Sequence, residues 1–219
     1  MIFTWQPVQL SLFVAVMATA LTLIMAVPVA YWLLKGKWKG KSILETIMIL
    51  PLVLPPSVIG FMLIIMFGNN SFIGSGIQQF FGQGIMFTPF AAVLAAAVVA
   101  FPLMYQTAKA GFQSLPPDVE GAAKVDGATE VKVFFFISLP LATRALVSGM
   151  ILSFTRALGE FGATLMFAGN IPGKTQTIPT SIYLAIESGQ TNVAWVYVSI
   201  SIGISVLFLL LVQKISRDS

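Results

Sequence analysis

The sequence contains no cysteine and no histidine, and few of its residues carry a charge. Without cysteine there is no disulfide scaffold and no thiol nucleophile, and without either residue the usual zinc sites and histidine proton shuttles are excluded. Charged residues make up 9% of the 219 residues, whereas a soluble domain carries about a quarter. These absences exclude most enzyme chemistry and an ordinary soluble domain.

Hydrophobic residues make up 57% of the chain, and its mean hydropathy is +0.92. Such a composition is typical of an integral membrane protein whose main contact is the lipid bilayer. The net charge of +4 could suggest a nucleic-acid partner. The basic residues lie beside apolar runs, however, where they normally hold loops on the cytoplasmic side, so we expect no nucleic-acid binding.

Five apolar segments are long enough to cross the bilayer, which takes about 20 helical residues. The first lacks a basic start and a cleavage site, so we interpret it as an uncleaved span. We expect an all-α polytopic helical bundle forming one transmembrane domain over residues 1–219, with neither end long enough for a soluble core. The predicted spans are residues 8–34, 43–67, 87–107, 141–167 and 193–212.

Lysines cluster in KGKWKGK (residues 35–41), between the first two predicted spans. The positive-inside rule places this loop in the cytoplasm and the N-terminus outside. Alternation then places Lys109–Lys132 and the C-terminal tail, with Lys214 and Arg217, in the cytoplasm. The Gly- and Gln-rich segments 68–86 and 169–190 fall outside.

Prolines interrupt several spans, most strongly in LPLVLPPSVIG (residues 50–60). Pro55 and Pro56 predict either a packed kink or a hinge that lines a pathway, because neighbouring helices or water can satisfy the freed backbone groups. Small residues in AAVLAAAVVA (91–100) let helix backbones approach closely, so we interpret this segment as a packing face.

Arg156 and Glu160 are charges inside the fourth predicted span. At a separation of four they share a helix face and can pair, which lowers the cost of burying either alone. They predict either a structural ion pair or a positive charge that attracts an anion to a pathway. Gly159 and Gly162 flank Glu160 and would ease a bend, so they are candidate hinge residues.

The stretch between the third and fourth spans is unexpectedly polar. The Pro116–Pro117 pair predicts a helix start, and Asp118 and Glu120 complement the positive end of the helix dipole. Ala123 and Gly127, four apart, would share a face with little side chain. Such a strip can enter a groove on another protein, although an ordinary amphipathic surface helix would show a similar pattern.

The same stretch resembles the EAA loop of ABC-importer permeases, in which EAA is followed by three residues, a glycine, nine residues and I-x-L-P. Alignment on Gly127 puts Gly121 where the glutamate is usual, so Glu120 lies one residue early. The resemblance implies that the loop at about 111–133 couples the permease to an ATPase, through Glu120, Ala122, Ala123, Gly127, Ile137, Leu139 and Pro140.

Longer blocks resemble the permease subunits of molybdate importers: LPLVLPPSVIGFML (50–63), VLAAAVVAFPLM (93–104) and FTRALGEFGATLMFAGNIPGKTQTIPTSIY (154–183). Permeases for sulfate, thiosulfate or tungstate are close alternatives. The resemblance implies a type I ABC importer permease fold in a bacterial or archaeal cytoplasmic membrane. It also implies a homodimer, two ATPase subunits that hold ATP and Mg²⁺, and an extracytoplasmic oxyanion-binding protein.

This chain itself is expected to bind no cofactor or metal and to carry no catalytic residue. It contains no G-x-x-x-x-G-K-[ST], and the Gly-Lys-Thr of GNIPGKTQ has its upstream glycine at the wrong spacing. An ATPase-independent secondary transporter is the alternative from another class, but it would usually show an ion or proton relay in its spans. A membrane enzyme would need a nucleophile–base or metal constellation, which the sequence does not offer.

Overall fold

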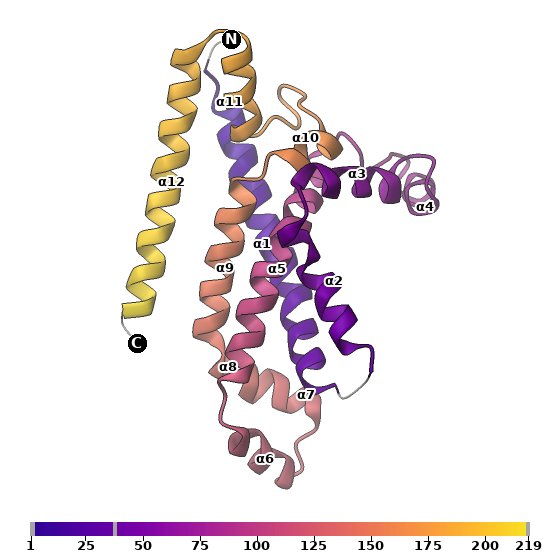
Figure 1. Cartoon of the computed structure of the whole chain (residues 1–219), viewed down its shortest axis with the longest axis vertical. Coiled ribbons are helices and arrows are strands. Elements are labelled where there is room, and N and C mark those ends of the chain that lie inside the picture. The colour runs from indigo at the N-terminus through magenta and orange to yellow at the C-terminus, as the bar shows by residue number, and fades with distance from the viewer. Residues whose placement is uncertain (1–2, 37–38, 218–219) are drawn as a thin grey trace.

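The computed structural model describes residues 3–36 and 39–217, without the side chains of residues 81 and 211–217. Lys37 of the predicted cytoplasmic loop and the side chains of Lys214 and Arg217 therefore lie outside the described residues. Within the described part every regular element is a helix, which confirms the predicted all-α fold class (Figure 1).

The elements follow one another with short connections. In chain order they are α1 (Gln6–Lys35), α2 (Lys41–Val53), α3 (Pro56–Phe67), α4 (Phe72–Phe81), α5 (Pro89–Gln113), α6 (Pro117–Val125), α7 (Glu130–Val133), the π-helix η1 (Phe134–Ser138), α8 (Leu139–Leu141), α9 (Thr143–Leu158), α10 (Gly162–Ala168), α11 (Ile178–Glu187) and α12 (Thr191–Arg217).

Three helices are long and apolar enough to cross a membrane alone: α1, α5 and α12. They correspond to the first, third and fifth predicted spans, and α5 runs six residues past the predicted end at residue 107, to Gln113. The other two predicted spans are bent pairs of helices. The described residues thus hold three spans, or up to five if each bent pair crosses once.

The break predicted within the second span, residues 43–67, is present as a corner between two helices. Helices α2 and α3 meet at 117°. The cause is the proline pair: a residue that precedes proline avoids the α conformation, and both Leu54 (ψ 142°) and Pro55 (ψ 137°) are in that position. Single prolines such as Pro28 and Pro102 remain inside their helices.

The fourth predicted span, residues 141–167, is also divided among several helices. The segment Glu130–Leu141 meets α9 at 74°, and α9 itself ends at Leu158. Gly159, Glu160 and Phe161 then separate α9 from α10. The predicted break at Gly159 and Gly162 is therefore confirmed as a change of helix, whereas its action as a hinge stays a prediction.

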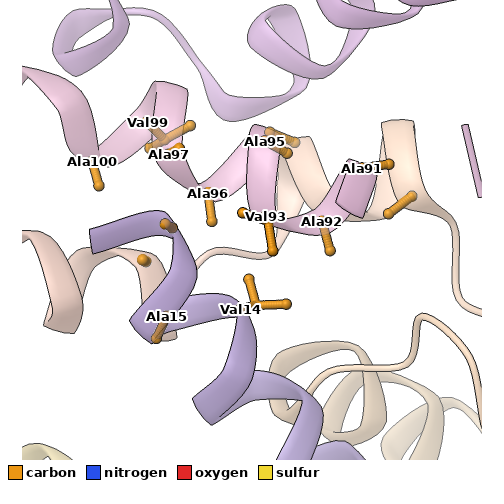
Figure 2. Close-up of a cluster of buried hydrophobic side chains, with 14 of the residues drawn as sticks. Val14, Ala15, Ala91, Ala92, Val93, Ala95, Ala96, Ala97, Val99 and Ala100 are labelled. Atoms are coloured by element: carbon orange, nitrogen blue, oxygen red, sulfur yellow. The ribbon is translucent and has the colours of Figure 1, made fainter. Parts of the chain in front are cut away.

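Alanines of α5 form the central packing face, as predicted for residues 91–100 (Figure 2). Ala91, Ala95 and Ala96 have no exposed surface, and the stripe packs against Val14 and Ala15 of α1. Lipid tails are as apolar as leucine, so the hydrophobic effect does not drive helices together inside a bilayer. Close van der Waals packing does, and small side chains allow it because the helix backbones can approach each other. This face fixes α1 against α5.

The bundle has two distinct ends (Figure 1). Helix α6 forms one end, beside the C-terminal end of α1, while the N-terminus, α10 and α11 lie toward the other. Helix α12 lies along the outside, where only 11% of its most apolar window is buried. Its Phe208 nevertheless stacks on Phe154 of α9, with ring centroids 4.0 Å apart.

Candidate coupling site and buried ion pair

Helix α6 forms as the sequence predicts. Pro116 precedes it in an extended conformation, Pro117 occupies its first turn, and Asp118 and Glu120 lie in that turn near the positive end of the helix dipole. None of its residues is buried. A nine-residue helix without a buried face cannot be explained by packing within the chain, so it is a candidate contact surface.

The expectation that Gly127 lies on a bare helical face was wrong. The helix ends at Val125, and Gly127 has φ +87°. Its N–H donates to the Lys124 carbonyl at 3.0 Å, and the Ala128 N–H donates to the Ala123 carbonyl at 2.9 Å. These two bonds form the Schellman motif that closes a helix C-terminus. Gly127 therefore ends α6 and orients the chain toward α7.

This role predicts the effect of replacing Gly127. The space around it is open, since an added Cβ would meet nothing within 4 Å, so the penalty comes from the left-handed backbone alone, about 1–2 kcal/mol. We expect Gly127→Val to raise amide hydrogen exchange in α6 about tenfold. Gly127→Asn should have a smaller effect, because asparagine tolerates this conformation. Equal exchange in both variants would contradict the capping role.

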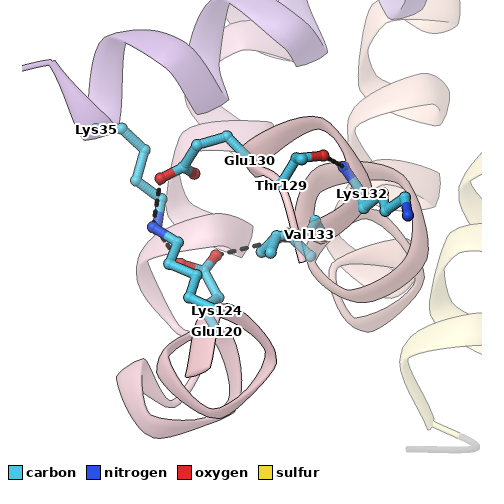
Figure 3. Close-up of polar contacts among 8 residues, drawn as sticks. Lys35, Glu120, Lys124, Thr129, Glu130, Lys132 and Val133 are labelled. Carbon is cyan, nitrogen blue, oxygen red and sulfur yellow. Dashed lines mark hydrogen bonds and ion pairs between the residues drawn. The ribbon is translucent and has the colours of Figure 1, made fainter. Parts of the chain in front are cut away.

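Glu120 holds α6 to the rest of the bundle (Figure 3). Its Oε2 forms an ion pair with Lys35 Nζ at the end of α1. Its Oε1 accepts a hydrogen bond of 2.8 Å from the Ser138 hydroxyl. Ser138 is fully buried and ends the π-helix. The carboxylate thus joins two elements that are distant in sequence.

A second ion pair, between Lys124 and Glu130, links α6 to α7 (Figure 3). Both side chains are largely exposed, and hydrogen bonding to Glu130 raises the pKa of Lys124 above its usual value. Because the lysine is already protonated at any pH below its usual pKa, this shift affects the pair only in strongly alkaline solution. The contribution of an exposed pair to stability is small.

Aromatic rings beneath α6 fix the π-helix to the bundle. The Phe134 ring lies 4.8 Å from the Tyr31 ring of α1 and 6.2 Å from the Phe112 ring of α5, measured between centroids. The candidate coupling residues Ile137, Leu139 and Pro140 follow in the π-helix and α8. The predicted EAA-like segment therefore runs from α6 to α8, and the Phe134 ring holds its π-helix against α1 and α5.

The exposed strip of α6 differs in part from the predicted one. Ala122 is exposed as expected, whereas Ala123 is half-buried on the side of Glu120. Gly121 and Val125 join Ala122 on the outward side, since they lie within one turn of it. Val125 is 87% exposed, and a Cβ on Gly121 would meet nothing within 4 Å. This apolar strip has no partner in the part of the chain that the structure describes.

Arg156 and Glu160 pair as the sequence predicts. Arg156 Nη1 lies 2.8 Å from Glu160 Oε2, and the Glu160 side chain is 1% exposed. Glu160 Oε1 also accepts a hydrogen bond of 2.8 Å from the Ala163 N–H in the first turn of α10. Both carboxylate oxygens are satisfied, so the pair joins the end of α9 to the start of α10.

The two candidate hinges lie against each other, which the sequence did not reveal. A Cβ on Gly162 would approach the Pro56 Cβ to 3.0 Å. One turn further along α3, a Cβ on Gly60 would approach the Met166 Cβ to 2.6 Å. Helices α3 and α10 therefore touch through glycines, and the proline corner and the α9–α10 break form one contact.

This contact predicts that Gly60→Ala destabilises the protein by about 1–3 kcal/mol, since α3 and α10 must separate. Gly76→Ala in α4 is the matched control, because nothing lies within 4 Å of its added Cβ. Thermal unfolding in detergent should show a lower midpoint for Gly60→Ala and an unchanged or slightly raised one for Gly76→Ala. A Gly60→Ala midpoint equal to that of the control would contradict close packing here.

Sequence reasoning missed Lys35 and Ser138 as the partners of Glu120. Lys35 was counted only as a loop charge, and Ser138 lies inside an apolar run. No local pattern joins residues that are 85 positions apart.

Among the residues that the structure describes, no cluster of three or more acidic residues could hold a metal ion.

Comparison with known families gives a match over most of the chain. Residues 18–218 match the family described as "Binding-protein-dependent transport system inner membrane component". YvgM of Bacillus subtilis (strain 168) is 54% identical over 208 residues, which cover 95% of this chain and 92% of that protein. The "Molybdenum transport system permease protein ModB" of Escherichia coli (strain K12) is 39% identical over 217 residues, covering 98% and 94%.

Solved structures share the fold at low sequence identity. A bacterial ABC transporter that imports the acidic polysaccharide alginate superposes with a TM-score of 0.73 at 15% identity, covering 97% of this chain and 78% of that one. The MetNI methionine ABC transporter, in an inward-facing conformation, gives 0.71 at 16% identity, with 97% and 94% covered. The chain thus shares its overall fold with these two ABC transporters.

Proposed function

This chain belongs to the family of binding-protein-dependent transport system inner membrane components, and from that premise we propose that it is the permease subunit of an ATP-driven importer of molybdate. The substrate is inferred from relatives, since ModB of Escherichia coli is named for molybdenum transport and is similar over nearly the whole chain. Sulfate, thiosulfate and tungstate are the alternative oxyanions. The proposed role is transport, with ATP hydrolysis carried out by a separate subunit.

The observation that carries the coupling part of the proposal is α6. It has no buried residue, yet Glu120 anchors it and a Schellman motif closes it. A short helix held at the end of a bundle with a bare outward strip suits a groove in a partner protein. We propose that this partner is the ATPase, and that Gly121, Ala122 and Val125 enter its groove.

The proposed assembly is a homodimer of this chain with two ATPase subunits that hold ATP and Mg²⁺, and with an extracytoplasmic binding protein that delivers the oxyanion. The N-terminus would face outside, and α6 and the C-terminus would face the cytoplasm. Closure of the ATPases on ATP would draw the two α6 helices together and shift the permeases between inward-facing and outward-facing states. The nucleotide supplies the difference in binding free energy between the two states.

Reconstitution into liposomes with the ATPase and the binding protein tests the proposal. We expect uptake of labelled molybdate that requires ATP and stops with vanadate. Competition by unlabelled sulfate and tungstate would rank the alternative substrates. Uptake that continues without the ATPase would contradict the importer assignment and favour a secondary transporter.

A further inference from the structure

Both carboxylate oxygens of Glu120 are bound within the chain. Oε2 pairs with Lys35, and Oε1 accepts the hydrogen bond from Ser138. The Glu120 side chain is 12% exposed, although it belongs to a helix without any buried residue. A carboxylate whose oxygens are occupied and covered is poorly placed to contact another protein, so its role must lie within this chain.

The two partners of Glu120 end two different structural units. Lys35 is the last residue of α1, whose other end contacts the loop before α11 through Gln6 and Gly173. Ser138 ends the π-helix, which continues through α8 into α9 and the Arg156–Glu160 pair. One side chain on α6 therefore contacts two of the elements through which a displacement at this end could reach the far end of the bundle (Figures 1 and 3).

We infer that Glu120 is a positioning residue that locks α6 to the ends of α1 and the π-helix, so that α6 cannot move without moving both. The inference rests on the proposed function, in which a partner ATPase displaces α6. Hydrogen bonds to ionised groups are about twice as strong as neutral ones, and the limited exposure of Glu120 reduces their screening by salt. A displacement of α6 would therefore be carried through these two interactions to α1 and to the π-helix.

The neighbouring pair Lys124–Glu130 provides a matched comparison (Figure 3). Its side chains are 40% and 48% exposed, and it joins only α6 to α7, six residues apart in sequence. It forms no hydrogen bond to the described residues of α1 or the π-helix, although both of its charges act electrostatically on Lys35. Glu120 and Glu130 thus lie in the same region, but Glu120 connects α6 to α1 and the π-helix, whereas Glu130 connects α6 to α7.

The test is the number of oxyanions imported per ATP hydrolysed by the reconstituted complex. We expect Glu120→Gln to lower this ratio about fivefold or more, while ATP hydrolysis and assembly with the ATPase are retained. Glu130→Gln should leave the ratio unchanged. The exchange Lys35→Glu with Glu120→Lys should restore much of the ratio, because it rebuilds the ion pair with reversed charges.

Three results would overturn the inference: an unchanged ratio in Glu120→Gln, an equal loss in Glu130→Gln, or loss of ATPase assembly in Glu120→Gln, which would mean that Glu120 faces the partner. Failure of the charge exchange to restore the ratio would also count against it. The wild-type complex separates this inference from the proposed function. Absence of ATP-dependent uptake in the wild type would refute the function itself, before any variant is compared.

Discussion

Arg156→Met is expected to destabilise the protein strongly. Glu160, whose side chain is 1% exposed, would lose its ion-pair partner and keep only the Ala163 N–H. Removing one partner of a buried pair typically costs about 3–5 kcal/mol, because the remaining charge is left uncompensated. The melting temperature of the purified protein in detergent should therefore fall by about 6–20 °C, since each kcal/mol lowers it by about 2–4 °C.

The double variant Arg156→Met with Glu160→Gln is the control. A neutral amide still offers an oxygen to the Ala163 N–H, so most of the lost stability should return. Uptake measured on the same variants separates the two roles predicted for the pair. A structural pair predicts that uptake recovers with stability. A stable double variant that imports no anion would instead place Arg156 in the translocation pathway.

Ala122→Trp is expected to abolish productive docking of the ATPase. Ala122 is exposed on the outward strip of α6, beside Gly121 and Val125. The large tryptophan ring would clash with the walls of a groove that accepts only small side chains, so α6 could not enter it. We expect affinity for the ATPase to fall at least about tenfold, equivalent to about 1.4 kcal/mol, and uptake to be lost.

Ala110→Trp is the matched control, because Ala110 is an exposed alanine in the last turn of α5, close in sequence to α6 but outside it. Its ATPase affinity should remain near that of the wild type. Both proteins should unfold at similar temperatures, since neither alanine is buried. Normal ATPase binding by Ala122→Trp would remove α6 from the interface.

Much of the fold could be predicted because the bilayer imposes strong constraints. Apolar length identified α1, α5 and α12, and the alanine run identified the face that packs on α1. The bends were less predictable. Pro55 and Pro56 indicated a break, but apolarity alone could not show that α3 turns away from α2 by 117°, since lipid-compatible residues continue through the corner.

The candidate site was predictable only where partners are close in sequence. Arg156 and Glu160 are four apart and pair as expected. Gly127 was recognised by its spacing, yet its left-handed φ made it a cap instead of part of a helical face. The contact of Gly162 with Pro56 and the bond of Glu120 with Lys35 depend on tertiary packing. No periodicity along the chain encodes such contacts.

The absence of cysteine makes one measurement especially direct. Val125→Cys would place a unique thiol on α6 at a position that is 87% exposed. Membrane-impermeant maleimide can then be applied to vesicles of either orientation, with and without the ATPase. The proposed coupling role predicts labelling only from the cytoplasmic side, and protection of the thiol when the ATPase is bound. Labelling from the outer side, or equal labelling with and without the ATPase, would contradict it.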